Sequence, residues 1–186
     1  MGRLILITGG ARSGKSSFAE KYTAKYGKKV AYIATSQICD EEMEFRVRLH
    51  RERRPDCWQT YEAPFAAHRA VAEAAAAGCD MLLMDCLTVY VSNLLCSVED
   101  IEDSAQNYQL LQQRCNELIE AVRGSECTLV LVTNEVGAGI VPANRLAREF
   151  RDLAGLANQI MAGAAEEVYL VAAGIPVNIK RLAEKL

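Results

Sequence analysis

Residues 9–16 read Gly9-Gly10-Ala11-Arg12-Ser13-Gly14-Lys15-Ser16 and match the phosphate-binding pattern G-x-x-x-x-G-K-[ST]. The apolar run Arg3–Thr8 precedes them and predicts a buried strand, while Ser17–Tyr22 predicts the first turns of a helix. This order of strand, loop and helix is the context that the pattern requires, so a glycine turn without a ligand is the weaker interpretation. The sequence therefore predicts a site for a nucleoside triphosphate.

Each part of this loop has a chemical role. Glycines let backbone N–H groups turn toward phosphate oxygens, and the N-terminus of the following helix adds partial positive charge. Lys15 is predicted to hold the β- and γ-phosphates, and the Ser16 hydroxyl to ligate Mg²⁺. Asp85 ends the apolar run Met81–Asp85, the place where phosphate-loop enzymes put the acid that supports Mg²⁺. A plain turn residue is the alternative for Asp85, but beside the loop the metal role is favoured.

The composition is that of an ordinary globular protein. Of the 186 residues, 51% are hydrophobic and 24% are charged, so we expect one domain with a real core, residues 1–186. The net charge of −3 gives no basic excess, which argues against nucleic-acid binding. No apolar run is long enough to span a membrane, and Leu4–Ile7 is too short for a signal peptide. The seven cysteines form no C-x-x-C pair, so we expect reduced thiols in the cytoplasm rather than zinc or disulfides.

Short apolar runs alternate with amphipathic segments along the chain. This alternation predicts an α/β fold with a mostly parallel sheet and helices on both faces. The expected extended segments are Arg3–Thr8, Lys29–Ala34, Trp58–Tyr61, Met81–Asp85, Thr128–Thr133, Val168–Ala172 and, as a short last strand, Pro176–Lys180. The expected helices run from the loop to Tyr26 and over Asp40–Arg53, Pro64–Ala77, Leu87–Leu95, Gln106–Arg123 and Leu146–Ala165. An antiparallel pair of strands at the C-terminus is left open.

Polar segments follow four of the predicted strands. In folds of this kind ligands bind at the carboxyl ends of the strands, so these segments are expected to face one cleft. They are Gly9–Ser16, Thr35–Asp40, Asp85–Thr88 and Asn134–Asn144.

An arginine-rich stretch surrounds His50. Arg46 and Arg54 stand four residues to either side of it on the predicted helix, and Arg53 stands three beyond. Nearby guanidinium groups disfavour an imidazolium ion, so His50 is expected to stay neutral near pH 7 and to be able to act as a nucleophile. Arginines also bind phosphate oxygens well, which suits attack by His50 on phosphorus. The alternative is a basic, solvent-facing helix, and the residues alone favour that alternative.

The remaining candidate residues are less specific. His68 lies among small helix residues and is interpreted as structural or surface-exposed. Glu62 could accept hydrogen bonds from a base or a ribose. Arg145, Arg148 and Arg151 lie three apart on one helix face, where they could bind an anionic substrate, pair with acids across a subunit interface or face solvent. Two glycines in the segment before that helix predict a pliable loop.

The sequence also bears on the class of protein. A regulatory GTPase would carry an Asn-Lys-x-Asp segment after a late strand, but the chain reads Thr133-Asn134-Glu135-Val136 there. A transport or motor ATPase would usually need more chain or partner domains, so a small kinase or nucleotidyltransferase fits the size better. A kinase in which His50 is idle, and a nucleotide-binding subunit without turnover, remain as alternatives.

The phosphate-binding loop is one of several uncommon motifs that span nearly the whole chain. They are Gly9–Ser16, Ala34–Gln37, the series Arg46, His50, Arg54, Pro55, Trp58, Thr60 and Glu62, then Val132–Pro142, Asn144–Arg148, Phe150–Gly155 and Ile179-Lys180. In these motifs the chain resembles the bifunctional adenosylcobinamide kinase/adenosylcobinamide-phosphate guanylyltransferase family of cobalamin biosynthesis. The resemblance implies a RecA-like phosphate-loop (P-loop) fold and a homotrimer.

The same resemblance implies two reactions. In the first, ATP or GTP phosphorylates the hydroxyl on the aminopropanol arm of adenosylcobinamide. In the second, GTP transfers GMP to adenosylcobinamide phosphate through a guanylylated histidine, with release of pyrophosphate. His50 matches the histidine nucleophile of the family and, with Lys15, is the expected catalytic residue.

The resemblance also implies a set of nucleotide and metal contacts. The nucleotide-binding residues would be Gly9, Gly10, Ala11, Arg12, Ser13, Gly14, Lys15, Ser16, Ala34, Thr35, Ser36, Arg51, Glu52, Arg53, Arg54, Glu62 and Asp85. Ser16 and Asp85 would ligate Mg²⁺. Some relatives carry Glu in place of Asp85, and either carboxylate can serve.

Overall fold

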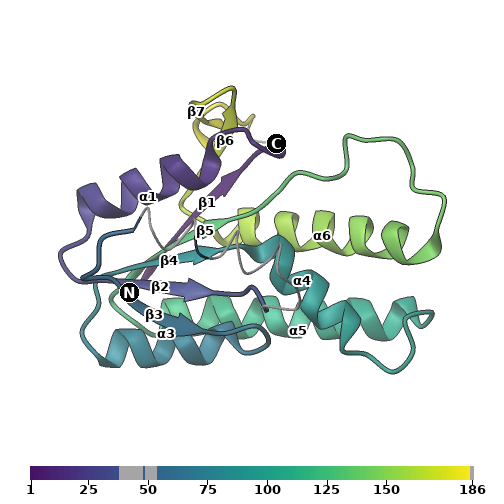
Figure 1. Ribbon diagram of the computed structural model, residues 1–186, viewed down its shortest axis with the longest axis horizontal. Helices are drawn as coiled ribbons and strands as arrows, with labels where there is room; N and C mark the ends of the chain where they lie inside the picture. The colour runs from purple at the N-terminus through teal and green to yellow at the C-terminus, as the bar shows by residue number, and fades with distance from the viewer. Residues whose placement is uncertain (38–47, 49–53, 185–186) are drawn as a thin grey trace.

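The computed structural model describes residues 1–37, 48 and 54–184. Its elements, labelled as in Figure 1, are β1 (Arg3–Thr8), α1 (Lys15–Tyr26), β2 (Val30–Ala34), β3 (Gln59–Glu62), α3 (Ala67–Ala76), β4 (Met81–Asp85), α4 (Leu87–Cys96), α5 (Ser104–Arg123), β5 (Thr128–Val132), α6 (Arg145–Ala164), β6 (Glu167–Ala172), β7 (Ile175–Asn178) and the 3₁₀ turn η1 (Ile179–Arg181). The helix expected over Asp40–Arg53 falls, apart from Arg48, on residues outside the described ranges. No described helix is both long and apolar enough to cross a membrane.

Within the described residues the strands form one seven-stranded sheet in the order β3-β2-β4-β5-β1-β6-β7. All neighbouring strands are parallel except β6 and β7, which are antiparallel. The predicted mostly parallel α/β fold is thus confirmed, and the C-terminal antiparallel pair is present. Strands β1 and β4 have the predicted boundaries, because each is an apolar run bounded by polar residues or glycine.

Helices cover both faces of the sheet, as predicted (Figure 1). Among the described helices, α1 packs on one face, and α3, α4, α5 and α6 pack on the other. Side chains of β1 alternate between the two: Ile5 and Ile7 lie in the core on the α1 side. Leu4 and Leu6 lie in the core on the opposite side. Because both faces are covered, the central strands are apolar throughout.

Most of the other element boundaries differ from prediction by one or two residues, and two differences have a visible cause. The helix expected from Pro64 begins at Ala67, because the Pro64 carbonyl instead accepts a 3.0 Å hydrogen bond from Asn93 Nδ2 of α4. The last strand covers Ile175–Asn178 rather than Pro176–Lys180, because the chain turns into η1 directly afterwards. Neither difference moves a residue of the predicted cleft.

Candidate nucleotide-binding site

The glycine-rich loop joins the end of β1 to the start of α1. A side chain does not fit at Gly9, because its Cβ would lie 2.4 Å from the carbonyl oxygen of Val171 and 2.7 Å from Ser13 Oγ. Gly14, the N-cap of α1, has a φ of 94°, in the left-handed region that favours glycine. Ser13 O accepts a 2.8 Å hydrogen bond from the N–H of Gly174, just beyond β6. The loop is therefore held against the β6–β7 connection through backbone contacts that require glycine.

Lys15 is the first residue of α1 and its side chain folds back onto the loop. The residue is only 9% exposed, and its Nζ donates a 3.1 Å hydrogen bond to the carbonyl oxygen of Gly10. Ser16 follows at the helix N-terminus and is half-buried. Within the described residues, the buried hydroxyls of Ser13 and Thr8 have no hydrogen-bond partner. Because buried polar groups are nearly always paired, these hydroxyls indicate a place where water or a ligand completes the site.

Strand register places five residues in one row at the carboxyl edge of the sheet. Ala34 of β2 pairs with Glu62 of β3 on one side and with Asp85 of β4 on the other. Asp85 pairs in turn with Val132 of β5, and Val132 pairs with Ile7 of β1. Ile7, Val132 and Ala34 pack in the core on the α1 side, so the row points to the α1 face. The two predicted carboxylates therefore share an edge and a face of the sheet with the loop.

Thr35 joins the chain beyond β2 to the chain beyond β4. It is fully buried, and its Oγ1 both donates to Cys86 O and accepts from Cys86 N, each at 2.9 Å. The peptide bond between Asp85 and Cys86 is cis. Asn93 Nδ2 donates a 2.8 Å hydrogen bond to the carbonyl oxygen of Thr35. The resemblance places Thr35 at the nucleotide. Its hydroxyl makes these hydrogen bonds within the protein and anchors the residue after Asp85.

Arg54 lies against Tyr32, next to this anchor. Its guanidinium carbon is 3.5 Å from the centroid of the Tyr32 ring, and the Tyr32 hydroxyl donates a 3.4 Å hydrogen bond to Asp85 O. Burial, followed by the charge of Asp85, raises the pKa of Tyr32, so this hydroxyl stays protonated. The same two causes raise the pKa of the Cys86 thiol to about 12, so Cys86 is not a nucleophile near neutral pH.

Most of the predicted nucleotide-binding residues of the arginine-rich stretch lie outside the described ranges. Arg54 is the member of the predicted set that the structure describes. The members outside the described residues are His50, Arg51, Glu52 and Arg53.

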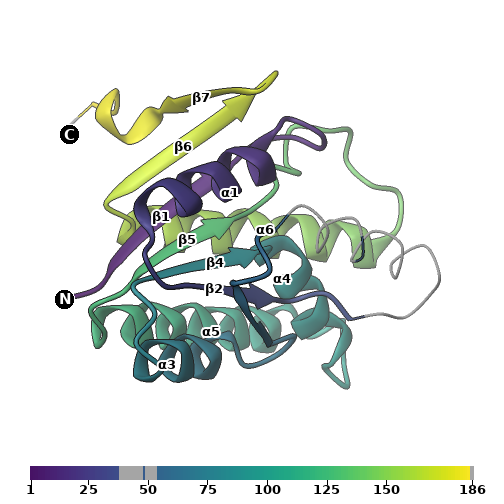
Figure 2. The ribbon, with the colours of Figure 1, turned by 60° about the vertical axis from the view of Figure 1, so that its left-hand side comes forward.

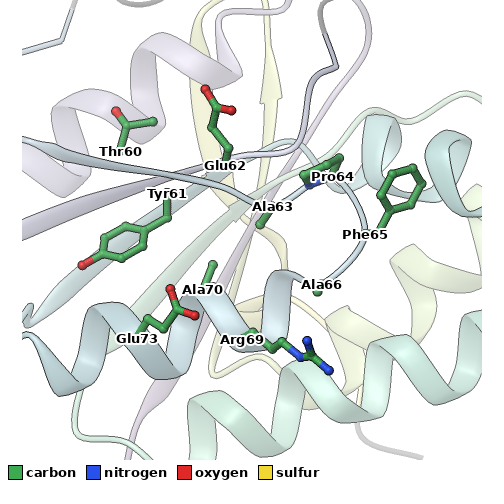
Figure 3. Close-up of a pocket in the computed structure, with 10 residues that line it drawn as sticks. All are labelled: Thr60, Tyr61, Glu62, Ala63, Pro64, Phe65, Ala66, Arg69, Ala70 and Glu73. Carbon is green, nitrogen blue, oxygen red and sulfur yellow. The ribbon is translucent and has the colours of Figure 1, made fainter.

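A pocket of about 520 Å³ runs between the outer edge of β3 and the start of α3 (Figure 3). It is lined by Thr60, Tyr61, Glu62, Ala63, Pro64, Phe65, Ala66, Arg69, Ala70 and Glu73. Figure 3 shows Tyr61 and Ala63 pointing toward α3, whereas Thr60 and Glu62 point to the other side of the strand. Arg69 and Glu73 come from α3 and were not among the predicted site residues. They carry no sequence signal, because the fold alone brings α3 beside β3.

His68 lies away from the row of carboxylates. Its Nδ1 is 3.4 Å from Glu117 Oε2, which links α3 to α5. Hydrogen bonds from Gln113 and Arg114 lower the pKa of Glu117. This position agrees with the structural interpretation of His68, which stays a prediction.

The three arginines of α6 make contacts within the chain. Arg145 forms a 3.0 Å ion pair with Glu102, and Arg151 forms one of 3.1 Å with Asp152. Arg148 Nη1 donates to the carbonyl oxygens of Pro142 and Ala143, at 3.0 and 2.7 Å. Two of these arginines therefore attach α6 to the segments that precede it in the chain.

In this fold the first strand of the sheet leads through a glycine-rich loop with a lysine into a helix, and acidic residues lie at the same edge of the sheet. This is the arrangement of phosphate-loop nucleotide-binding proteins. Comparison with known proteins then defines the family. The family model described as cobinamide kinase / cobinamide phosphate guanyltransferase matches residues 5–179. The chain belongs to this family, which makes it a bifunctional enzyme of cobalamin biosynthesis, both a cobinamide kinase and a guanylyltransferase.

Curated relatives agree with this assignment. The chain is 46% identical over 182 residues to the bifunctional adenosylcobalamin biosynthesis protein CobU of Salmonella typhimurium (strain LT2), covering 95% of this chain and 99% of the relative. The protein of the same name from Escherichia coli (strain K12) shows the same identity and coverage. The bifunctional adenosylcobalamin biosynthesis protein CobP of Pseudomonas aeruginosa is 41% identical over 175 residues, covering 94% and 96% of the two chains.

Proposed function

We propose that the chain carries out two consecutive reactions at one phosphate-binding site. It first phosphorylates the aminopropanol hydroxyl of adenosylcobinamide with ATP or GTP. It then transfers GMP from GTP to adenosylcobinamide phosphate, which yields adenosylcobinamide-GDP and pyrophosphate. The observation that carries the proposal is the row in which Asp85 and Glu62 share an edge and a face of the sheet with the Lys15 loop. We treat residues 1–186 as one catalytic domain.

In the kinase step the loop holds the triphosphate. Lys15 lies at the loop, and its positive charge would stabilise the negative charge that develops on the transferred phosphoryl group. Backbone N–H groups of Gly9–Ser16 and the N-terminus of α1 would donate to the phosphate oxygens. The unpaired Ser13 hydroxyl is a further donor in the same loop.

Ser16 and Asp85 are the residues that would hold Mg²⁺. Their hydroxyl and carboxylate oxygens are the hard donors that this ion prefers. Among the described residues no three His, Cys, Asp or Glu side chains cluster as a metal site. This fits Mg²⁺, which binds through one or two protein oxygens and takes its other ligands from phosphates and water. When bound, the ion neutralises charge on the β- and γ-phosphates.

In the transferase step His50 is the proposed nucleophile, and this role rests on the resemblance. A nitrogen of His50 attacks the α-phosphorus, and the bond to the β-phosphate breaks so that pyrophosphate leaves. A phosphate oxygen of adenosylcobinamide phosphate then attacks the phosphorus of the guanylyl-histidine and restores His50. Arg54, whose guanidinium lies over the Tyr32 ring, would contact the nucleotide near this row.

The other end of the row is assigned to the nucleoside. Glu62 lies four strands from β1, which at about 4.8 Å a strand is about 19 Å from the loop strand. Its exposed carboxylate can accept hydrogen bonds from a base or a ribose. The phosphates at the loop and the nucleoside toward Glu62 would then lie along the same edge, with Ala34 and Asp85 between them.

The assembly and location are further proposals. The resemblance implies a homotrimer, and several large apolar side chains that the monomer leaves exposed are available for contacts between copies. They are Ile140, Val141, Leu146, Ile175 and Val177. The cytoplasm is the proposed location, because the described cysteines are free thiols and the reactions consume ATP and GTP.

Two assays with the purified chain test the function. Transfer of labelled phosphate from γ-labelled ATP or GTP to adenosylcobinamide measures the kinase. Release of pyrophosphate from GTP that depends on adenosylcobinamide phosphate measures the transferase. Both are expected with the same preparation. Kinase activity without pyrophosphate release would instead indicate a kinase in which His50 is idle.

A further inference from the structure

A third carboxylate stands at the carboxyl edge of the sheet, in the segment after β5. The parallel ladder between β1 and β5 continues past the end of the strand, where Thr133 N donates to Ile7 O over 2.9 Å. The next rung is a 3.1 Å hydrogen bond from Glu135 N to the carbonyl oxygen of Gly9, the first glycine of the phosphate loop. The backbone of Glu135 is therefore fixed directly beside the loop that holds the triphosphate.

The sheet order makes Glu135 the nearest of the strand-end carboxylates to the loop among those that the structure describes. Strand β5 is the immediate neighbour of β1, whereas β4 with Asp85 is the second strand away and β3 with Glu62 the fourth. At about 4.8 Å a strand, Asp85 and Glu62 stand about 10 and 19 Å from β1, and Glu135 about 5 Å. Glu135 thus follows the strand that lies between β1 and the strand of the proposed Mg²⁺ ligand Asp85.

Partly buried hydrogen bonds hold the end of β5 in place. Asn134 N donates to Thr88 Oγ1 of α4 over 2.7 Å. Thr133 Oγ1 donates to Asn158 Oδ1 of α6, also over 2.7 Å, and Asn158 Nδ2 donates to Asn134 O over 3.1 Å. Two helices therefore fix the backbone from which Glu135 projects. A side chain on such an anchored segment can be placed precisely enough for chemistry.

The Glu135 side chain itself is exposed, and its Oε1 accepts a 2.7 Å hydrogen bond from Gly137 N. The pliable loop that Gly137 belongs to leads away from the edge of the sheet toward α6 (Figure 2). The hydrogen bond from Gly137 N thus orients the Glu135 carboxylate through one of its oxygens, and the exposed carboxylate is accessible to a substrate that enters from solvent.

We propose that Glu135 accepts the proton of the substrate hydroxyl during phosphoryl transfer, an assignment that rests on the proposed kinase function. The hydroxyl oxygen forms a bond to the γ-phosphorus, and the bond from that phosphorus to the β-γ bridging oxygen breaks. The electron pair leaves with the nucleoside diphosphate, and the hydroxyl proton moves to the carboxylate of Glu135. Lys15 is a cation that donates hydrogen bonds, and Asp85 is assigned to the metal, so neither of them serves as the acceptor.

The guanylyl transfer needs no such acceptor, because adenosylcobinamide phosphate attacks as an anion that has already lost its proton. Comparing the rates of the two reactions in a Glu135 variant therefore distinguishes proton acceptance from a role of Glu135 in shaping the loop. Loss of loop structure would weaken both reactions, since both use the same triphosphate site. Loss of the proton acceptor would weaken only the first.

The decisive variant is Glu135→Gln, since its amide oxygen can still accept the hydrogen bond from Gly137 N. We expect kcat of the kinase to fall about 10²-fold or more, with little change in KM for the nucleotide. Pyrophosphate release from GTP and adenosylcobinamide phosphate should stay within about twofold of the unmodified enzyme. Glu135→Asp, which keeps a carboxylate, should retain more kinase activity than Glu135→Gln.

Glu126→Gln is the matched control. Glu126 is an exposed carboxylate just before β5, at the opposite end of the same strand, and its change should leave both rates unaltered. An unchanged kinase rate in Glu135→Gln, or an equal loss of both reactions, would overturn the assignment. An unmodified enzyme that shows no kinase activity would instead count against the proposed function, so the two failures are distinguishable.

Discussion

Glu62 of β3 and Asp85 of β4 lie on either side of Ala34 of β2. Each pairs with Ala34 in the register of its strand, and all three residues share one face of the sheet. At about 4.8 Å a strand the two carboxylate-bearing backbones are about 10 Å apart. They are thus too far apart to share one ligand atom but close enough to contact different parts of one nucleotide. This separation is the basis for assigning Asp85 to the metal and phosphate end and Glu62 to the nucleoside end.

Replacing Lys15 with alanine should impair both reactions. The ammonium group lies at the loop that both reactions are proposed to use, and losing it removes charge stabilisation from each transition state. We expect the kinase and transferase rates to fall about 10²- to 10³-fold, measured by the two assays above. Lys21→Ala, at an exposed position of the same helix, is the control. A kinase rate that is unaffected by Lys15→Ala would count against a shared site.

Replacing His50 with alanine should separate the two activities in the opposite way to Glu135→Gln. The variant cannot form a phosphoramidate, so incubation with α-labelled GTP should leave the protein unlabelled. Its kinase rate should remain close to that of the unmodified enzyme. In the unmodified enzyme the label should be acid-labile and base-stable. Normal guanylyl transfer by His50→Ala would contradict the assignment of the nucleophile.

Replacing Glu62 with glutamine should weaken nucleotide binding more than catalysis. The change removes the charge from an acceptor while keeping its shape, and hydrogen bonds to charged groups contribute about 1.5–3 kcal/mol. The KM for GTP in the transferase step should rise about tenfold or more, with kcat less affected. Glu73→Gln is a useful comparison, because Glu73 lines the same pocket from α3. Equal effects of the two changes would show that the pocket, and not the row along the sheet edge, contacts the nucleoside.

Replacing Thr35 with valine should destabilise the protein. The change preserves shape but leaves both the N–H and the carbonyl of Cys86 without the hydroxyl that they contact in the buried site. We expect the free energy of unfolding to fall by about 2 kcal/mol, measured by urea denaturation. Thr35→Ser keeps the hydroxyl and should lose clearly less. Equal stability of the valine variant and the unmodified protein would mean that the hydroxyl does not support the fold.

Much of the fold could be predicted from the sequence because its signals are local. The apolar runs of β1 and β4 gave the boundaries of these two strands to the residue, and the glycine pattern correctly indicated a loop between β1 and a helix. The predicted start of α3 at Pro64 was wrong, because the observed start depends on Asn93. This residue of α4 contacts Pro64 only in the folded chain. Local patterns hold no information about such distant partners.

The candidate site was predictable in its parts but not in its arrangement. The sequence indicates that Glu62 and Asp85 follow or end strands, but the row that joins them depends on strand order and register. The same holds for Thr35, where a contact with the nucleotide was predicted and the structure adds an internal role for its hydroxyl. Single-domain organisation, the roles of the site residues and the trimer stay predictions.

Helix α1 has a consequence for how one loop can serve two reactions. It begins with Lys15, and its Ala19 is fully buried against the core of the sheet. Among the described helices it alone packs on that face, so displacing the lysine would disturb the packing of the sheet itself. The phosphate-binding loop, Gly9–Ser16, is thus the part of the site that stays in place. We therefore expect the nucleotide, rather than the loop, to be repositioned when the attacked phosphorus changes from γ to α.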